Sequence, residues 1–128
     1  MNLDTLYREE ILEHWQNPQN FGKMRGADLV IEQVNPLCGD QVTFFFKIES
    51  GKIKDVSFEG SGCAISIASA SMLSGVIKNK PIAALSKITG KNVLSLMGAD
   101  KNSFPPARLK CAFLSLEAVR KIGQMQAD

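Results

Sequence analysis

The chain has a single histidine, only three cysteines, and no apolar run long enough to cross a bilayer. A transmembrane helix needs about 20 mostly apolar residues, so we do not expect a membrane-spanning protein. The N-terminus is acidic and amphipathic. It lacks the apolar core followed by small residues that marks a secretory signal. We therefore expect a cytoplasmic protein.

The sequence also has little net charge and no basic stripe. It carries 15 basic and 13 acidic residues, a formal net charge of +2, and the basic residues are dispersed. A nucleic-acid-binding protein would be expected to show a basic patch or stripe, so a nucleic acid partner is not expected. An apolar fraction of 45% over 128 residues is ordinary for a globular protein. It predicts one compact domain over residues 1–128.

The cysteines do not form a recognisable disulfide or zinc-finger pattern. Their number is odd, no CxxC pair occurs, and they are spaced 25 and 48 residues apart at Cys38, Cys63 and Cys111. In a reducing compartment all three are expected to be free thiols.

The first predicted element is a helix from Asp4 to Gln16. An apolar stripe recurs every four residues and ends at Trp15 (Leu3, Tyr7, Ile11, Trp15). We expect the stripe to pack on the core, although such a terminal helix can also dock a partner. His14 lies beside the stripe without a Cys, His or carboxylate at ligand spacing, so it is not expected to bind metal.

The middle of the chain reads as three strands, and the rest as helices. The strands are predicted over Leu29–Val34, Gln41–Glu49 and Lys52–Glu59, with Ser50–Gly51 as a two-residue turn. The helices are predicted from Ala64 to about Val76, over Pro81–Ile88 and Asn92–Met97, and from Pro105 to about Ile122. This order predicts an α+β fold, in which helices cover one face of a small three-stranded antiparallel sheet.

Each cysteine lies at the edge of a predicted element. Cys38 falls in the turn between the first two strands, Cys63 follows Gly60–Gly62 at the start of a helix, and Cys111 lies in the early turns of the last helix. A helix N-terminus carries positive partial charge, which lowers the pKa of a nearby thiol and favours the thiolate.

If the three cysteines meet, they supply three soft ligands, and Asp40 adds a hard fourth. Such a set fits tetrahedral zinc, and three thiolates with one exchangeable ligand fit a labile iron–sulfur cluster. Lys110 could hold neighbouring thiolates by its charge. The alternative is three separate buried cysteines, which pack as small apolar residues. A glycine, proline or charged residue beside each cysteine favours the shared site.

Three motifs, in order along the chain, resemble those of the U-type iron–sulfur cluster assembly scaffolds (IscU, SufU and the N-terminal domain of NifU). They are Asn35–Asp40, Gly60–Ser71 and Phe104–Cys111, and the segment Tyr7–Gly22 is also similar. The resemblance covers nearly the whole chain. It implies a SufE/NifU-like fold, with a cysteine site at one end.

The resemblance also implies a function. Cys38, Cys63 and Cys111 would ligate a transient [2Fe–2S] or [4Fe–4S] cluster, or zinc, and Asp40 would tune its release or bind zinc. Cys111 would accept persulfide sulfur from a cysteine desulfurase, and the cluster would pass to acceptor or carrier proteins. The protein would then be a scaffold and not an enzyme. The alternative is a zinc-dependent sulfur acceptor that activates the desulfurase; a thiol redox sensor is a weaker third reading, because no two cysteines lie close in sequence.

Lys110 is the main departure from the IscU pattern, because IscU-type members carry histidine immediately before the third cysteine. A basic residue there is similar to the SufU branch. That branch also has an insertion before the third motif, and the segment from Ile88 to Phe104 is shorter than that insertion. Residues 104–108 partly resemble the segment that a dedicated chaperone grips in IscU-type proteins.

Overall fold

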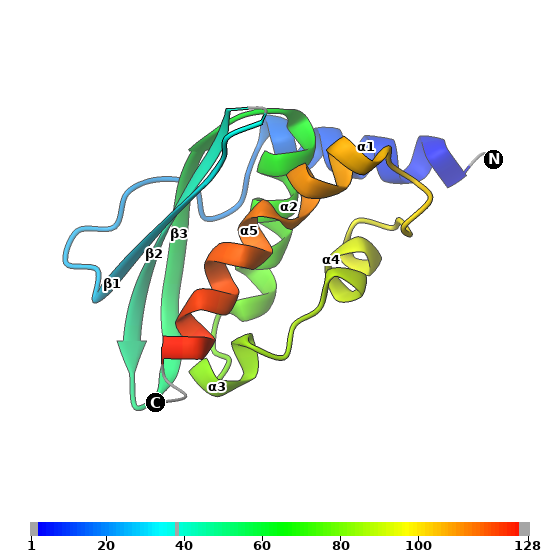
Figure 1. Cartoon of the computed structure of the whole chain (residues 1–128). Helices are drawn as coiled ribbons and strands as arrows, with labels where there is room; N and C mark the ends of the chain where they lie inside the picture. The colour runs from blue at the N-terminus through cyan, green and yellow to red at the C-terminus, as the bar shows by residue number, and fades with distance from the viewer. Residues whose placement is uncertain (1–2, 38, 126–128) are drawn as a thin grey trace.

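The computed structural model describes residues 3–37 and 39–125, with side chains from Glu9 onward (Figure 1). The helices are α1 (Leu3–Gln16), α2 (Ala64–Ile77), α3 (Ile82–Leu85), α4 (Gly90–Leu96) and α5 (Pro106–Met125). The strands are β1 (Leu29–Asn35), β2 (Asp40–Glu49) and β3 (Lys52–Ser61). Within these residues, no helix has both the length and the apolar character needed to span a membrane.

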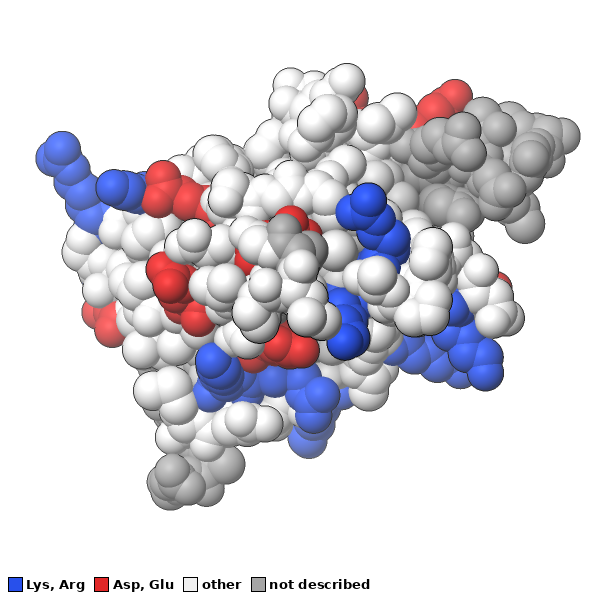
Figure 2. All heavy atoms as spheres, turned by 45° about the horizontal axis from the view of Figure 1, so that its top comes forward, with Lys and Arg blue, Asp and Glu red and all other residues white. Residues whose placement is uncertain are grey.

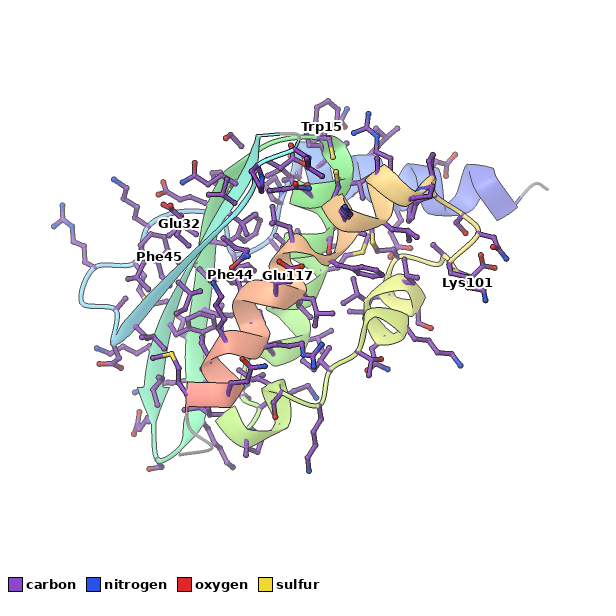
Figure 3. The ribbon with its side chains drawn as sticks, viewed as in Figure 1. Trp15, Glu32, Phe44, Phe45, Lys101 and Glu117 are labelled. Carbon is purple, nitrogen blue, oxygen red and sulfur yellow. The ribbon has the colours of Figure 1, made fainter. Side chains whose placement is uncertain are left out.

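The three strands form one antiparallel sheet in the order β1-β2-β3, which confirms the predicted meander. Ser50 and Gly51 join β2 to β3, and both have positive φ angles (53° and 75°). Positive φ at both central residues is the requirement of the type I′ turn, whose twist matches that of paired strands. Alternation along β2 places Phe44 on the helix side of the sheet and Phe45 on the opposite side (Figure 3).

Helices α2 and α5 cover one face of the sheet, and α1 lies against α2 (Figure 1). The layer between sheet and helices contains three fully buried rings, those of Phe44, Phe46 and Phe58. The Phe44 ring is stacked on the other two, with centroid separations of 5.9 and 5.7 Å. Burial of large apolar side chains is the main source of folding free energy, so this layer anchors the fold. The predicted α+β class is confirmed.

The prediction that the apolar stripe of α1 packs on the core is wrong at the last residue of the stripe, Trp15. Ile11 is buried, but Trp15 is 44% exposed; the side chains of Leu3 and Tyr7 lie outside the described residues. Trp15 lies at the end of α1 (Figure 3) and lines a shallow groove with Pro18 and Phe21.

His14 connects α1 to α2 through a hydrogen bond. Its Nδ1 is 2.7 Å from the Ser71 hydroxyl oxygen, which also accepts a 2.8 Å hydrogen bond from the backbone N–H of Gln19.

The two short helices differ from the predicted ranges. α3 spans only Ile82–Leu85, with Pro81 immediately before it. α4 begins at Gly90, two residues before the predicted start, because Thr89 and Asn92 form a capping box. The Thr89 hydroxyl accepts the Asn92 N–H, and the Asn92 side chain accepts the Thr89 N–H. This reciprocal pairing satisfies donors that a helix start leaves free.

Candidate functional site

Side chains from three elements converge at the end of the sheet where β2 begins. Asp40 is the first residue of β2, Cys63 immediately precedes α2, and Cys111 lies in the second turn of α5. One carboxylate oxygen of Asp40 and the two cysteine sulfurs all lie within 4.8 Å of one another. Asp40 and Cys111 are buried, and Cys63 is half-buried. The structure thus brings together three of the four predicted ligands; Cys38 lies outside the described residues.

The turn before β2 sets the position of Asp40. The Asn35 backbone carbonyl accepts the Gly39 N–H at 2.8 Å, and the Asn35 side-chain oxygen accepts the Leu37 N–H at 3.1 Å. Gly39 adopts a φ of 76°, a left-handed conformation that glycine adopts without strain. These bonds close the turn and bring Asp40 opposite Asn35 as the first residue pair of β1 and β2.

The Gly62–Cys63 backbone contacts one oxygen of the Asp40 carboxylate. A Cβ atom on Gly62 would lie 2.6 Å from Asp40 Oδ1, so only glycine permits this approach. The Cys63 N–H donates to the same oxygen at 3.3 Å. Because Cys63 is the N-cap of α2, the carboxylate also faces the positive end of the helix dipole.

The second carboxylate oxygen contacts side chains. The Ser66 hydroxyl donates to Asp40 Oδ2 at 2.6 Å, and the Cys63 thiol donates to it at 3.5 Å. Ser66 is fully buried, and the carboxylate of Asp40 therefore lies within a set of protein donors.

Burial raises the pKa of the Cys111 thiol from its ordinary value of 9.0 to about 12, and hydrogen bonds with Asp40 and Cys63 and their charges add to the effect. The prediction that the helix start lowers the pKa is wrong for this cysteine. A helix dipole acts mainly within the first turn, whereas Cys111 is the sixth residue of α5. In the metal-free protein Cys111 is therefore protonated at neutral pH.

Arg108 supplies positive charge to the site, and sequence reasoning missed it. The pKa of the Arg108 guanidinium is raised by its electrostatic interaction with Cys63 and by hydrogen bonds to Cys63 and Cys111. The signal in the sequence was its position three residues before Cys111, a spacing that places two side chains on one helix face.

Lys110, the cation that the sequence analysis proposed beside the thiols, is exposed. It lines a cavity of about 300 Å³ with Leu37 and Glu117. Acidic and basic side chains are interspersed on this end of the molecule, which Figure 2 turns toward the viewer.

The donor set and its spacing fit a metal such as zinc. Zn–S bonds of about 2.3 Å put two tetrahedral sulfur ligands about 3.8 Å apart, slightly closer than the 4.8 Å limit that encloses the three donors. The donor atoms would need to move by only about an ångström to reach the separations of zinc ligands. Two sulfurs and one carboxylate oxygen are also donors of the kinds that zinc takes in proteins.

The chain is similar to several characterised proteins along nearly its full length. It is 40% identical over 137 residues to the zinc-dependent sulfurtransferase SufU of Bacillus subtilis, covering 94% of this chain and 90% of that protein. It is 35% identical over 116 residues to the iron–sulfur cluster assembly scaffold protein IscU 1 of Archaeoglobus fulgidus, covering 91% and 73%.

A solved structure and a family model agree with these similarities. The crystal structure of a Fervidobacterium islandicum protein, proposed as the iron–sulfur cluster assembly scaffold of its SUF system, superposes with a TM-score of 0.73 and 31% identity. The match covers 91% of this chain and 96% of that one. Residues 6–125 match the model of the NifU-like N-terminal domain. Because this match spans almost the whole chain, and includes Asp40 and all three cysteines, the protein belongs to the NifU-like N-terminal domain family.

Proposed function

We propose that this protein is a scaffold on which an iron–sulfur cluster is assembled and from which it is passed to acceptor proteins. Cys38, Cys63 and Cys111 would hold the cluster, and Asp40 would be the ligand that exchanges most readily. The observation that carries the proposal is the meeting of Asp40, Cys63 and Cys111 within 4.8 Å. The names of its relatives, among them IscU scaffold proteins, support it.

The same side chains would hold zinc when no cluster is present. Zinc would supply positive charge that keeps its thiol ligands deprotonated. The ligand set supports binding of a cation, because a buried acidic side chain and two thiols, all donors that zinc takes, lie within 4.8 Å of one another.

Sulfur would arrive as a persulfide carried by a cysteine desulfurase, with Cys111 as the acceptor. The Cys111 thiolate would attack the terminal sulfur of the donor persulfide. A new S–S bond would form at Cys111, the donor S–S bond would break, and the donor cysteine would leave as a thiolate. Cys111 is 2% exposed and protonated in the metal-free protein. The transfer therefore requires that this sulfur first lose its proton and become accessible.

A second function, a zinc-dependent sulfurtransferase that activates the desulfurase, is favoured by two observations. The SufU relative, which is named for that activity, shares 40% identity over 94% of this chain. Lys110 also replaces the histidine that IscU-type members carry, and this favours the SufU branch. In this second function Cys111 would pass its sulfur onward, and no cluster would be built on the protein.

Anaerobic reconstitution separates the two functions. The protein is incubated with ferrous iron, cysteine and a cysteine desulfurase, and the absorbance of an iron–sulfur chromophore is followed together with bound zinc. The scaffold function predicts a chromophore that transfers to an apo-ferredoxin and that Cys63→Ser abolishes. Retained zinc, a faster desulfurase and no chromophore would instead establish the sulfurtransferase function.

A further inference from the structure

Ser66 is the third residue of α2, and its side chain is fully buried against the site. The Ser66 oxygen lies 2.6 Å from Asp40 Oδ2 and 3.6 Å from the Cys63 sulfur. A hydroxyl has one proton to donate, and the shorter contact takes it. The Ser66 proton is therefore donated to the carboxylate and not to the Cys63 sulfur, whose own proton also goes to Asp40 Oδ2.

The two oxygens of Asp40 have different surroundings as a result. Oδ1 accepts the backbone N–H of Cys63 and lies against Gly62, whose position the backbone fixes. Oδ2 accepts the short bond from the Ser66 side chain. Hydrogen bonds to an ionised acceptor are stronger than those between neutral groups. A buried carboxylate held in this way has a defined orientation toward the Cys63 and Cys111 sulfurs.

We propose that Ser66 is a positioning residue, which holds the Asp40 carboxylate in the orientation that completes the metal site. The inference deepens the proposed function and rests on it, because it assumes that Asp40 is a metal ligand. Groups that hydrogen-bond a metal ligand fix its orientation and tune its strength, and their removal typically lowers metal affinity 10- to 100-fold. Ser66 would act on the metal through Asp40, because its one proton goes to the carboxylate at 2.6 Å and not to the Cys63 sulfur 3.6 Å away.

Two other buried serines of α2 provide a comparison. Ser69 donates to the Ala112 backbone carbonyl and Ser74 to the Ser71 carbonyl, at 2.6 and 2.7 Å. The first bond joins α2 to α5, and the second lies within α2. Ser66 differs from them in donating to a carboxylate at the metal site. Ser74 lies two turns farther along the same helix, so Ser74→Ala is a matched control for the loss of one buried hydroxyl.

The test compares Ser66→Ala with Asp40→Ala and with the double variant, using the full chain and Zn²⁺ or Co²⁺ alone as the probe. Zinc affinity is measured by competition with a chromophoric chelator, and the ligand field by the visible spectrum of the Co²⁺-loaded protein. We expect Ser66→Ala to weaken zinc binding about 10- to 100-fold and to change the Co²⁺ bands. Ser74→Ala should leave both unchanged. In the Asp40→Ala background, removal of the Ser66 hydroxyl should have no further effect.

The outcomes separate this inference from the proposed function. If Asp40→Ala leaves zinc affinity and the Co²⁺ spectrum unchanged, Asp40 is not a ligand and the metal site itself is wrong. If Asp40→Ala weakens binding while Ser66→Ala leaves it unchanged or tightens it, only the positioning role is overturned. An equal loss from Ser66→Ala with and without Asp40 would also overturn it, because the hydroxyl would then act independently of the carboxylate.

Discussion

The two ends of the sheet are closed by turns that are built from different interactions. At the β2–β3 end, backbone groups satisfy one another: Ile53 donates to Lys80 and accepts from Asn79, and Ile82 donates to Gly51. At the β1–β2 end, a buried carboxylate, two thiols and a hydroxyl lie against one another. The first end uses hydrogen bonds that need no further partner. The second concentrates groups that bind protons and metals.

The two helix starts show the same contrast. Thr89 caps α4 through reciprocal hydrogen bonds with Asn92. Cys63 occupies the N-cap of α2, where its side chain makes no capping bond within the described part of the chain. Serine, threonine, aspartate or asparagine at that position would stabilise the helix. The site end therefore lacks a stabilising cap of the kind that α4 has. Substitutions in the core should lower stability and leave metal affinity nearly unchanged, whereas substitutions at the site should lower metal affinity and leave stability unchanged or higher.

The largest expected effect is on the core. Phe44→Ala removes a fully buried ring that is stacked on two others, and such truncations cost about 3 to 5 kcal/mol. Urea unfolding in the presence of a chelator measures the loss. Zinc affinity of the folded fraction should change less than twofold, because Phe44 supplies no ligand. A zinc affinity that falls in proportion to stability would show that the two regions are not separable.

The next effect is on the site. Cys63→Ser replaces a sulfur ligand, and it should weaken zinc binding by more than the 10- to 100-fold typical of groups that only support a ligand. The same change places serine at the N-cap of α2, where it favours the helix by up to about 1 kcal/mol. The metal-free variant should therefore unfold at an equal or higher urea concentration than the parent protein. Lower metal-free stability would contradict the contrast drawn between the two helix starts.

The smallest effect is a pH dependence that originates at Cys111. Its pKa is about 12 in the folded metal-free protein, against an ordinary value of 9.0. Between these values the folded state holds a proton that the unfolded chain has released. The contribution of Cys111 to the free energy of unfolding is therefore fully present below about pH 9 and is lost as the pH rises toward 12. Urea midpoints at pH 8 and pH 10.5 measure the fall, and Cys111→Ala is the control in which this part of the slope should vanish. An identical slope in that variant would assign the effect to other groups.

Much of the fold follows from the sequence because local patterns and tertiary packing agree. The alternation along β2 and the Ser50–Gly51 turn specify the hairpin, and the edges of the sheet then decide where Asp40 and Cys63 lie. The burial predicted for Trp15 was wrong, because a four-residue period identifies the apolar face of a helix but not how much of that face the neighbouring helix covers. α3 proved shorter than predicted, and its start after Pro81 was displaced by one residue.

The contacts within the site were less predictable. Convergence of Asp40, Cys63 and Cys111 was expected, because motifs at element edges meet when a sheet and its helices pack. Arg108 was missed because a single arginine in a helix usually faces solvent. Ser66 was missed because a serine among alanines in α2 reads as a packing residue. Only the position of the neighbouring strand shows that its hydroxyl meets a carboxylate.

The most direct test of the account is the zinc coordination shell of the metal-loaded protein, measured by X-ray absorption at the zinc edge. We predict sulfur scatterers at about 2.3 Å together with an oxygen scatterer at about 2.0 to 2.2 Å. The number of sulfurs should fall by one in Cys63→Ser and stay constant in Asp40→Ala. A shell of nitrogen and oxygen alone, or one that neither substitution alters, would contradict the claim that these residues form one site.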